Sequence, residues 1–114
     1  MPPPPLSWSV GPCGSGRRIT VCGEVDVATS AQLQGVLAAQ IERTAGPIWV
    51  NLAEVTFMDA SGLRALVDAS DTLRAKGLRL ELEDPSRSVR RLLAASSMSA
   101  YFGLTPEKEQ HNQG

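Results

Sequence analysis

Two short segments of the chain combine carboxylate and hydroxyl side chains. Asp26 and Thr29 stand in the first segment, and Asp59 and Ser61 stand in the second. Such residues can cap helices, can supply a nucleophile where a base is held nearby, or can form a surface on which another molecule docks. Both segments follow apolar runs, and α/β folds place their sites at the carboxyl ends of parallel strands. The sequence therefore offers these two segments as candidate loops of a functional site.

The second segment, residues 56–63, is the richer of the two. Asp59 is placed to cap a helix, Ser61 falls in the first turn, and Gly62 omits a side chain that would cover the neighbouring surface. Helical periodicity puts Ser61 opposite the inner stripe, with an accessible hydroxyl, and Ala60 nearer the margin of that stripe. This pattern predicts a place where another molecule can dock closely. The alternative is that Asp59 and Ser61 only satisfy free amides at a helix start.

Catalysis by Ser61 would need a base held beside it. The sole histidine, His111, lies in a polar tail far along the chain, so a Ser-His hydrolase is not supported. The glycine-rich residues 11–16 lack the Lys-Ser/Thr ending and the following helix of a phosphate-binding loop. Two cysteines cannot assemble a zinc site. We therefore expect a protein that is not an enzyme and that holds no metal and no cofactor.

Bulk properties limit the class of protein further. The length of 114 residues suits one domain. A content of 42% hydrophobic and 20% charged residues is typical of a globular protein with a packed core. The net charge of -1 leaves no basic excess for direct nucleic-acid binding. No apolar run approaches the roughly 20 residues of a membrane-spanning helix, and the N-terminus lacks the order of a signal peptide. We expect a cytoplasmic protein without membrane insertion.

The two cysteines are expected to be reduced in that compartment. Cys22 stands within an apolar strand pattern and is predicted to be a small buried hydrophobic residue. Cys13 stands in a glycine-rich segment. A redox switch between the two thiols is the alternative.

An N-terminal hairpin is the first structural element that periodicity predicts. Residues 6–10 form a candidate edge strand, and the glycines and proline of residues 11–16 form a turn. Residues 18–25 then alternate apolar and polar side chains, as a strand with one buried face does.

A helix and a central strand are expected next. Thr29 and Gln32 match a capping box, in which the Thr hydroxyl accepts from a helical amide, and the helix should end before residues 46–47, Gly-Pro. Residues 48–52 are almost continuously apolar, which is typical of a strand buried on both faces at the centre of a sheet. Trp49 is expected in the core.

The remaining elements complete an α/β pattern. A second helix should run from its cap at Asp59 to a stop at Gly77, followed by a strand at residues 78–83 and a third helix at residues 86–95. In the third helix Arg87, Arg90 and Arg91 are expected to be solvated; the alternative is that they form a patch for a partner.

Strands that alternate with helices call for mainly parallel pairing with a mixed edge. We predict a single α/β domain with a mixed, mainly parallel sheet of four to five strands. Its expected divisions are an N-terminal segment at residues 1–16, the domain at residues 17–105 and a polar tail at residues 106–114.

Both candidate loops carry a resemblance to a known family. Residues 23–26, Gly-Glu-Val-Asp, followed by Thr29, and residues 57–63, Phe-Met-Asp-Ala-Ser-Gly-Leu, resemble the paired signatures of the STAS anti-sigma-factor antagonists. The second motif is the specific one. The resemblance extends from about residue 18 to residue 104, and residues 84–86 also resemble the late strand-to-helix turn of that family. It implies a STAS-like fold.

The resemblance also implies a function, which is partner switching in a bacterial cell. The domain would bind an anti-sigma factor with a histidine-kinase-like (GHKL) ATPase fold, so that a sigma factor is released and transcription is regulated indirectly. Phosphorylation by that kinase would end the binding, because a phosphate adds about -1.5 to -2 charges to the contact surface. The residues that the resemblance places in this surface are Asp26, Thr29, Met58, Asp59, Ala60, Ser61, Gly62 and Leu63.

The sequence departs from the family pattern at the modified residue. In switching members the phosphorylated serine directly follows the aspartate, and here that position is Ala60, which has no hydroxyl. Ser61 matches the second hydroxyl position of the motif. We expect Ser61 to be the phosphorylation candidate; the alternative is a protein that binds its partner without being switched off.

A second role within the same fold stays open. STAS domains also serve as accessory or regulatory subunits of membrane transporters, including ABC-type lipid systems. The compact signature at residues 59–63 and the length of the chain favour the sigma-regulatory role. The sequence leaves open whether the chain forms a homodimer.

Overall fold

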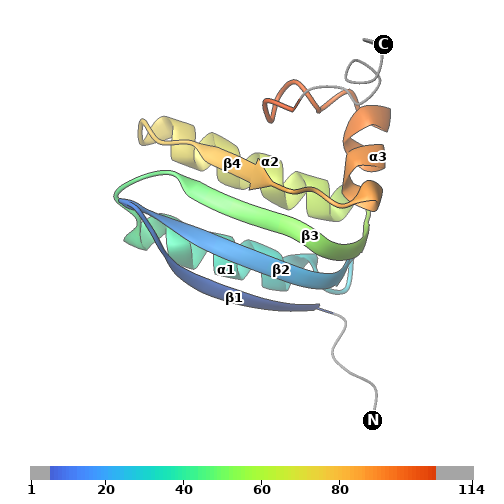
Figure 1. Ribbon diagram of the computed structural model, residues 1–114, viewed down its shortest axis with the longest axis horizontal. Helices are drawn as coiled ribbons and strands as arrows, with labels where there is room; N and C mark the ends of the chain where they lie inside the picture. The colour runs from blue at the N-terminus through green and yellow to red at the C-terminus, as the bar shows by residue number, and fades with distance from the viewer. Residues whose placement is uncertain (1–5, 105–114) are drawn as a thin grey trace.

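Four strands and three helices make up the part of the chain that the structure, a computed structural model, describes: residues 6–104. Their order is β1 (Leu6–Cys13), β2 (Gly16–Val25), α1 (Ser30–Arg43), β3 (Ile48–Met58), α2 (Ala60–Ala75), β4 (Leu80–Glu83) and α3 (Arg87–Ala95). The strands lie in the order β1-β2-β3-β4 (Figure 1). Because β1 is antiparallel to β2 and the other neighbours are parallel, the predicted mixed, mainly parallel α/β fold is confirmed.

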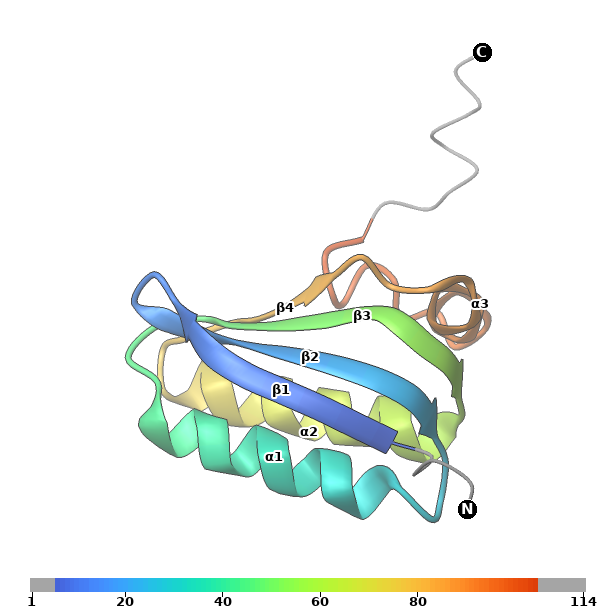
Figure 2. The ribbon, with the colours of Figure 1, turned by 60° about the horizontal axis from the view of Figure 1, so that its bottom comes forward.

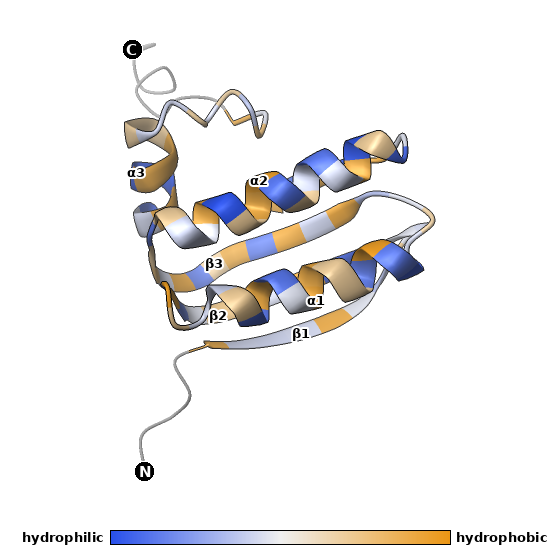
Figure 3. Ribbon diagram, turned by 180° about the vertical axis from the view of Figure 1, so that it is seen from behind, coloured by the Kyte–Doolittle hydropathy of each residue, from blue (hydrophilic) through white to orange (hydrophobic). Residues whose placement is uncertain are grey.

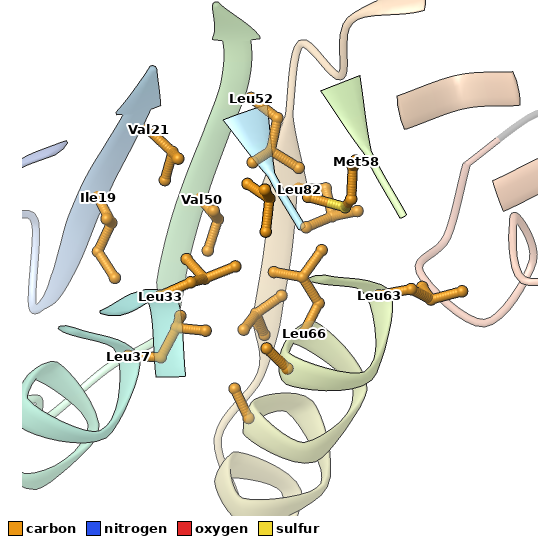
Figure 4. Close-up of a cluster of buried hydrophobic side chains, with 14 of the residues drawn as sticks. Ile19, Val21, Leu33, Leu37, Val50, Leu52, Met58, Leu63, Leu66 and Leu82 are labelled. Carbon is orange, nitrogen blue, oxygen red and sulfur yellow. The ribbon is translucent and has the colours of Figure 1, made fainter. Parts of the chain in front are cut away.

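Two helices cover one face of the sheet. Figure 2 shows α1 and α2 side by side below the strands, while α3 lies past the end of β4, beside the second half of β3. Figure 4 shows the core that results, with Ile19 and Val50 of the sheet pointing toward Leu33 and Leu66 of the helices. These four side chains are fully buried. Hydrophilic residues lie along the outward-facing sides of α1 and α2 (Figure 3).

The opposite face of the sheet is open over much of its area, which corrects one expectation. Residues 48–52 were predicted to be buried on both faces, but Trp49 and Asn51 are only partly covered. On this face Arg18 of β2 reaches past Asn51 to Glu83 of β4, with Nη2 and Oε2 2.7 Å apart. The Arg18 guanidinium holds the pKa of Glu83 below its ordinary value. Such a solvent-exposed pair contributes little to stability, so hydrophobic burial on the other face dominates.

Strand β3 runs six residues further than predicted, and two bulges interrupt the alternation by which its second half could have been recognised. The pairing with β2 shifts by one residue between Thr20 and Cys22, and by one more between Gly23 and Glu24. Each shift adds one unpaired residue to β3, and a bulge changes the direction in which later side chains point. Simple alternation after Leu52 therefore fails as a guide, and the buried positions of β3 become Ile48, Val50, Leu52, Val55 and Met58.

The N-terminal hairpin turns more tightly than its glycine content predicts. The turn is only Gly14 and Ser15, and Cys13 pairs with Gly16. Gly14 has a φ of 59°, which fits the first central position of a type II′ hairpin turn. The segment from Leu6, expected within residues 1–16, is thus a full strand of the sheet.

The pairing of the hairpin also separates the two cysteines. Cys13 lies opposite Gly16 at the turn, whereas Cys22 lies opposite Ser7 near the other end. Six positions along a strand span about 20 Å, far more than the roughly 4.4–6.8 Å between the Cα atoms of a disulfide. A redox switch between them within one chain is therefore wrong. Both thiols are partly exposed, so Cys22 is not the fully buried residue that was expected.

Candidate functional site

The two candidate segments lie together at one end of the sheet, as predicted. Val25 ends β2 opposite Met58 at the end of β3, and the amide of Asp59 donates to the carbonyl of Val25 at 3.1 Å. The loop from β2 to α1 and the start of α2 follow directly from these strand ends (Figure 1).

The first segment is a hydrogen-bonded turn, not a capping box. The Thr29 hydroxyl donates to the carbonyl of Glu24 at 2.9 Å and accepts from the amide of Asp26 at 3.0 Å. Thr29 precedes α1 but makes no side-chain cap bond, because its hydroxyl is already used within the turn. Asp26 in turn accepts from the amides of Ala28 and Thr29. Thr29 is buried and braces the loop from inside.

The second segment is built around Asp59, which caps α2 as predicted. Its Oδ1 accepts from the Ser61 amide at 2.9 Å and from the Ser61 hydroxyl at 2.5 Å. The bond from the hydroxyl, helped by the amides of the first turn, lowers the pKa of Asp59 from its ordinary value. The carboxylate is therefore ionised near neutral pH, and the Ser61 proton points at it.

The exposure of residues in the first turn of α2 differs from what helical periodicity predicts. Ala60 is exposed, whereas Ser61 is only partly exposed because its side chain folds back toward Asp59. Ala60, which was expected near the inner stripe, is therefore more exposed than Ser61. Wheel geometry fails here because the helix end projects beyond its neighbours.

Gly62 corrects a further expectation. It is buried, and a Cβ at this position would lie 2.6 Å from Cγ1 of Val25 and 2.8 Å from Cγ of Met58. Gly62 therefore lets α2 approach the ends of β2 and β3, and it does not open the outer surface. Met58 and Leu63 are also buried, and Figure 4 shows both within the hydrophobic cluster.

Two exposed hydrophobic residues flank the site and were given no role in the sequence-based prediction. Val27 in the β2–α1 loop is 78% exposed, and Phe57 near the end of β3 is 47% exposed. Phe57 faces solvent because the second bulge of β3 shifts its direction, which the period-two pattern does not encode. Val27 could have been noticed in the sequence, because it is a β-branched hydrophobic residue in a polar loop, where folding does not require such a residue.

The remaining chemistry near the site is sparse. Within residues 6–104, no group of three or more His, Cys, Asp or Glu side chains is placed to hold a metal ion. His111, the only candidate base of a hydrolase, lies outside the described residues. No helix among those described has the length and apolar character needed to cross a membrane.

The STAS domain family model matches residues 17–111, most of the chain. The chain belongs to the STAS domain family. Solved structures agree on the fold of this STAS domain. The anti-sigma factor antagonist SpoIIAA in its unphosphorylated form is 23% identical, with a TM-score of 0.73 over 94% of this chain and 95% of that one. The phosphorylated form of SpoIIAA from Bacillus is 21% identical, with a TM-score of 0.67 over 94% and 98%.

Two further relatives show how widely the fold is used. An anti-sigma factor antagonist from Mycobacterium paratuberculosis is 20% identical to this STAS domain, with a TM-score of 0.75 over 89% of this chain and 86% of that one. SLC26A9 is 17% identical, with a TM-score of 0.67 over 82% of this chain but only 18% of its own. The same fold thus occurs both as nearly a whole chain and as a small part of a larger one.

Substitution of Gly62 tests whether this glycine supports the site from inside. Gly62→Ala should lower the free energy of unfolding by about 1–3 kcal/mol, because the added methyl group overlaps Val25 and Met58. The matched control is Gly35→Ala in α1, where a Cβ meets nothing within 4 Å. This change should raise the free energy of unfolding by about 0.5–1 kcal/mol, because alanine has the higher helix propensity. Urea unfolding measures both, and equal effects would contradict the packing role.

Acid titration tests the cap. Asp59→Ala should lower stability by about 1 kcal/mol at pH 7, because α2 loses its N-cap. Since the folded pKa of Asp59 is lowered, its contribution is full above the unfolded value near 4 and disappears as the pH falls through the folded value. The difference between wild type and variant should therefore narrow toward pH 3. Asp68→Ala, an exposed change within α2, is the control, and a difference independent of pH would refute the ionic cap.

Proposed function

We propose that this STAS domain is an anti-sigma factor antagonist that binds an anti-sigma factor at the end of the sheet where α2 begins. The observation that supports the proposal is the exposure of Val27 and Phe57 beside the uncharged Ala60. Exposed aromatic and aliphatic side chains rimmed by polar groups are typical of protein interfaces. The binding surface, as we define it, consists of Asp26, Val27, Phe57, Ala60 and Ser61.

The buried members of the motif give this surface its shape. Thr29 holds the β2–α1 loop, and Gly62 lets α2 lie close to the strand ends. Met58 and Leu63 belong to the core, so they contribute to binding only by fixing the backbone above them. A preformed surface binds more tightly than a mobile one, because less conformational entropy is lost on association.

The partner that fits the family resemblance is an anti-sigma factor with a GHKL ATPase fold. Its capture by this domain would free a sigma factor and so regulate transcription without contact between this chain and DNA. Such switching takes place in the bacterial cytoplasm, where sigma factors work. The net charge of -1 is in keeping with a protein partner and not with a nucleic acid.

Ser61 is the proposed switch residue within this surface. Phosphorylation would join the Ser61 oxygen to the γ-phosphorus of ATP, release ADP and transfer the hydroxyl proton to solvent. The hydroxyl would then no longer donate to Asp59, and about two negative charges would lie beside a carboxylate that is already ionised. Repulsion and added bulk would oppose docking at this point, and Asp59 would lose one of its two bonds to Ser61.

A second role is favoured by one comparison. Because the fold makes up 18% of the SLC26A9 chain, a STAS domain can act as a module of a larger protein. An accessory subunit of a membrane transporter, such as an ABC-type lipid system, would use the same surface for a different partner. Binding assays with purified GHKL anti-sigma factors and ABC ATPases from the same organism distinguish the two roles.

Truncation of the exposed hydrophobic residues tests the binding surface. Val27→Ala and Phe57→Ala should each weaken binding of the anti-sigma factor about tenfold, since each removes about 1.4 kcal/mol of apolar contact. Neither change should lower the unfolding midpoint much, because both side chains are exposed. Isothermal titration calorimetry gives the affinities.

The matched control for this series is Val10→Ala, which truncates an exposed valine of β1 away from α2. Its affinity for the anti-sigma factor should equal that of the wild type. Unchanged affinity in both Val27→Ala and Phe57→Ala would place the docking surface elsewhere on the domain.

Incubation with the cognate kinase and ATP tests the switch. Mass spectrometry should show one added phosphate, which Ser61→Ala abolishes and Ser30→Ala, at the start of the neighbouring α1, retains. The modified domain should bind its partner at least about tenfold more weakly, because of the added charge. A phosphate on another residue would contradict the role of Ser61 and leave the binding surface itself unaffected.

A further inference from the structure

The two edges of the sheet differ in how well they are protected. At one edge β4 has only four residues, carries Glu81 and Glu83, and is followed by Pro85. Short length, charge and proline are the devices by which proteins prevent edge-to-edge pairing. At the other edge β1 has eight residues and no charged side chain, and its one proline, Pro12, lies at the end of the strand beside the turn. β1 is therefore the edge open to another strand.

The backbone of β1 offers alternate hydrogen-bonding groups to that strand. The residues that flank a two-residue turn form a hydrogen-bonded pair, so Cys13 and every second residue before it bond to β2. Leu6, Trp8, Val10 and Pro12 then direct their backbone groups away from the sheet. Pro12 fits this assignment, because it has no amide hydrogen and loses no ladder bond at an outward position.

Two exposed hydrophobic side chains accompany these free groups. Trp8 and Val10 are each 42% exposed, and they pair with the buried Val21 and Ile19, so they share the face of the sheet that carries α1 and α2. Figure 1 shows β1 as the outermost strand along its whole length. A strand added at this edge would cover both side chains and bond to the outward backbone groups.

We propose that the occupant of this edge is β1 of a second copy, paired antiparallel about a two-fold axis at Ser9. In this register Trp8 lies opposite Val10 of the second copy, and Leu6 lies opposite Pro12. Seven residues of each strand are then opposed. A shift toward the N-terminus would run the ladder into residues 2–5, four prolines that cannot donate.

Self-complementarity supports a second copy, because the two-fold register places the exposed Trp8 of each copy opposite the exposed Val10 of the other. Because residues 6–16 carry no charge, two copies meet at this edge without repulsion between like side chains. The result is one continuous sheet of eight strands with α1 and α2 of both copies on the same face. An interface of one strand pair is small, so the dimer should form with a Kd weaker than about 1 μM.

The dimer is independent of the function proposed above. The binding surface lies where β2 and β3 end and α2 begins, whereas the two-fold axis lies at the middle of β1. Failure of the dimer would leave partner binding untouched, and failure of partner binding would leave the dimer untouched.

Sedimentation velocity on the full chain over about a hundredfold range of concentration tests the dimer by mass action. The wild type should pass from monomer to dimer, and Val10→Lys should remain a monomer because each lysine would lie opposite Trp8 and diagonal to the other lysine, beside the axis. Val27→Lys, an equal change at an exposed valine that lies beyond the end of β2 and outside the paired strands, should dimerise as the wild type does. A wild type that stays monomeric overturns the proposal, as does a dimer that survives Val10→Lys or is lost in Val27→Lys.

Crosslinking tests the register separately. In a background of Cys13→Ser and Cys22→Ser, Ser9→Cys should give a covalent dimer under mild oxidation, because paired residues at the axis lie about 4.5 Å apart between Cα atoms. Ser7→Cys is the control, since its two copies would be about 13 Å apart along the strands. Circular dichroism confirms that both variants fold. Equal crosslinking of the two variants overturns the register at Ser9.

Discussion

The contact between the first turn of α2 and the ends of β2 and β3 is the constraint on which the rest of the structure depends. Gly62 lies so close to Val25 and Met58 that no side chain fits there. This contact fixes where α2 begins, and therefore where Asp59 caps it and where Ser61 and Ala60 are presented. The surface that we assign to partner binding is thus set by an interaction inside the domain.

A single carboxylate connects the structural and the regulatory parts of this arrangement. Asp59 accepts both the amide and the hydroxyl of Ser61, so the group that starts the helix also orients the proposed switch residue. The ordinary requirement that a helix start be capped and the proposed regulation are therefore met by the same atoms. The two explanations that the sequence left open for Asp59 and Ser61, capping and docking, are compatible.

The sequence predicted the fold well where one physical rule acted alone. Alternation identified β2, helix caps and stops bounded α2 between Asp59 and Gly77, and crossover connections implied parallel pairing. It failed where two rules compete. The Thr29 hydroxyl could cap α1 or close the turn before it, and only the tertiary arrangement decides for the turn. Gly62 was predicted to leave the neighbouring surface open, because its burial depends on contacts with strands that are distant in sequence.

The bulges of β3 explain why the sequence predicted neither the full length of this strand nor the exposure of Phe57, and they have a further consequence. Leu52, Val55 and Met58 face the core at intervals of three, so the facing of each residue depends on how many residues precede it in the strand. If the strand followed plain alternation after Val55, without the second bulge, the inward and outward positions at its end would be exchanged. Phe57 would then point toward the helices and Met58 toward solvent, and this end of the sheet would lose its outward aromatic side chain. The number of residues in this strand therefore determines which of its side chains face solvent.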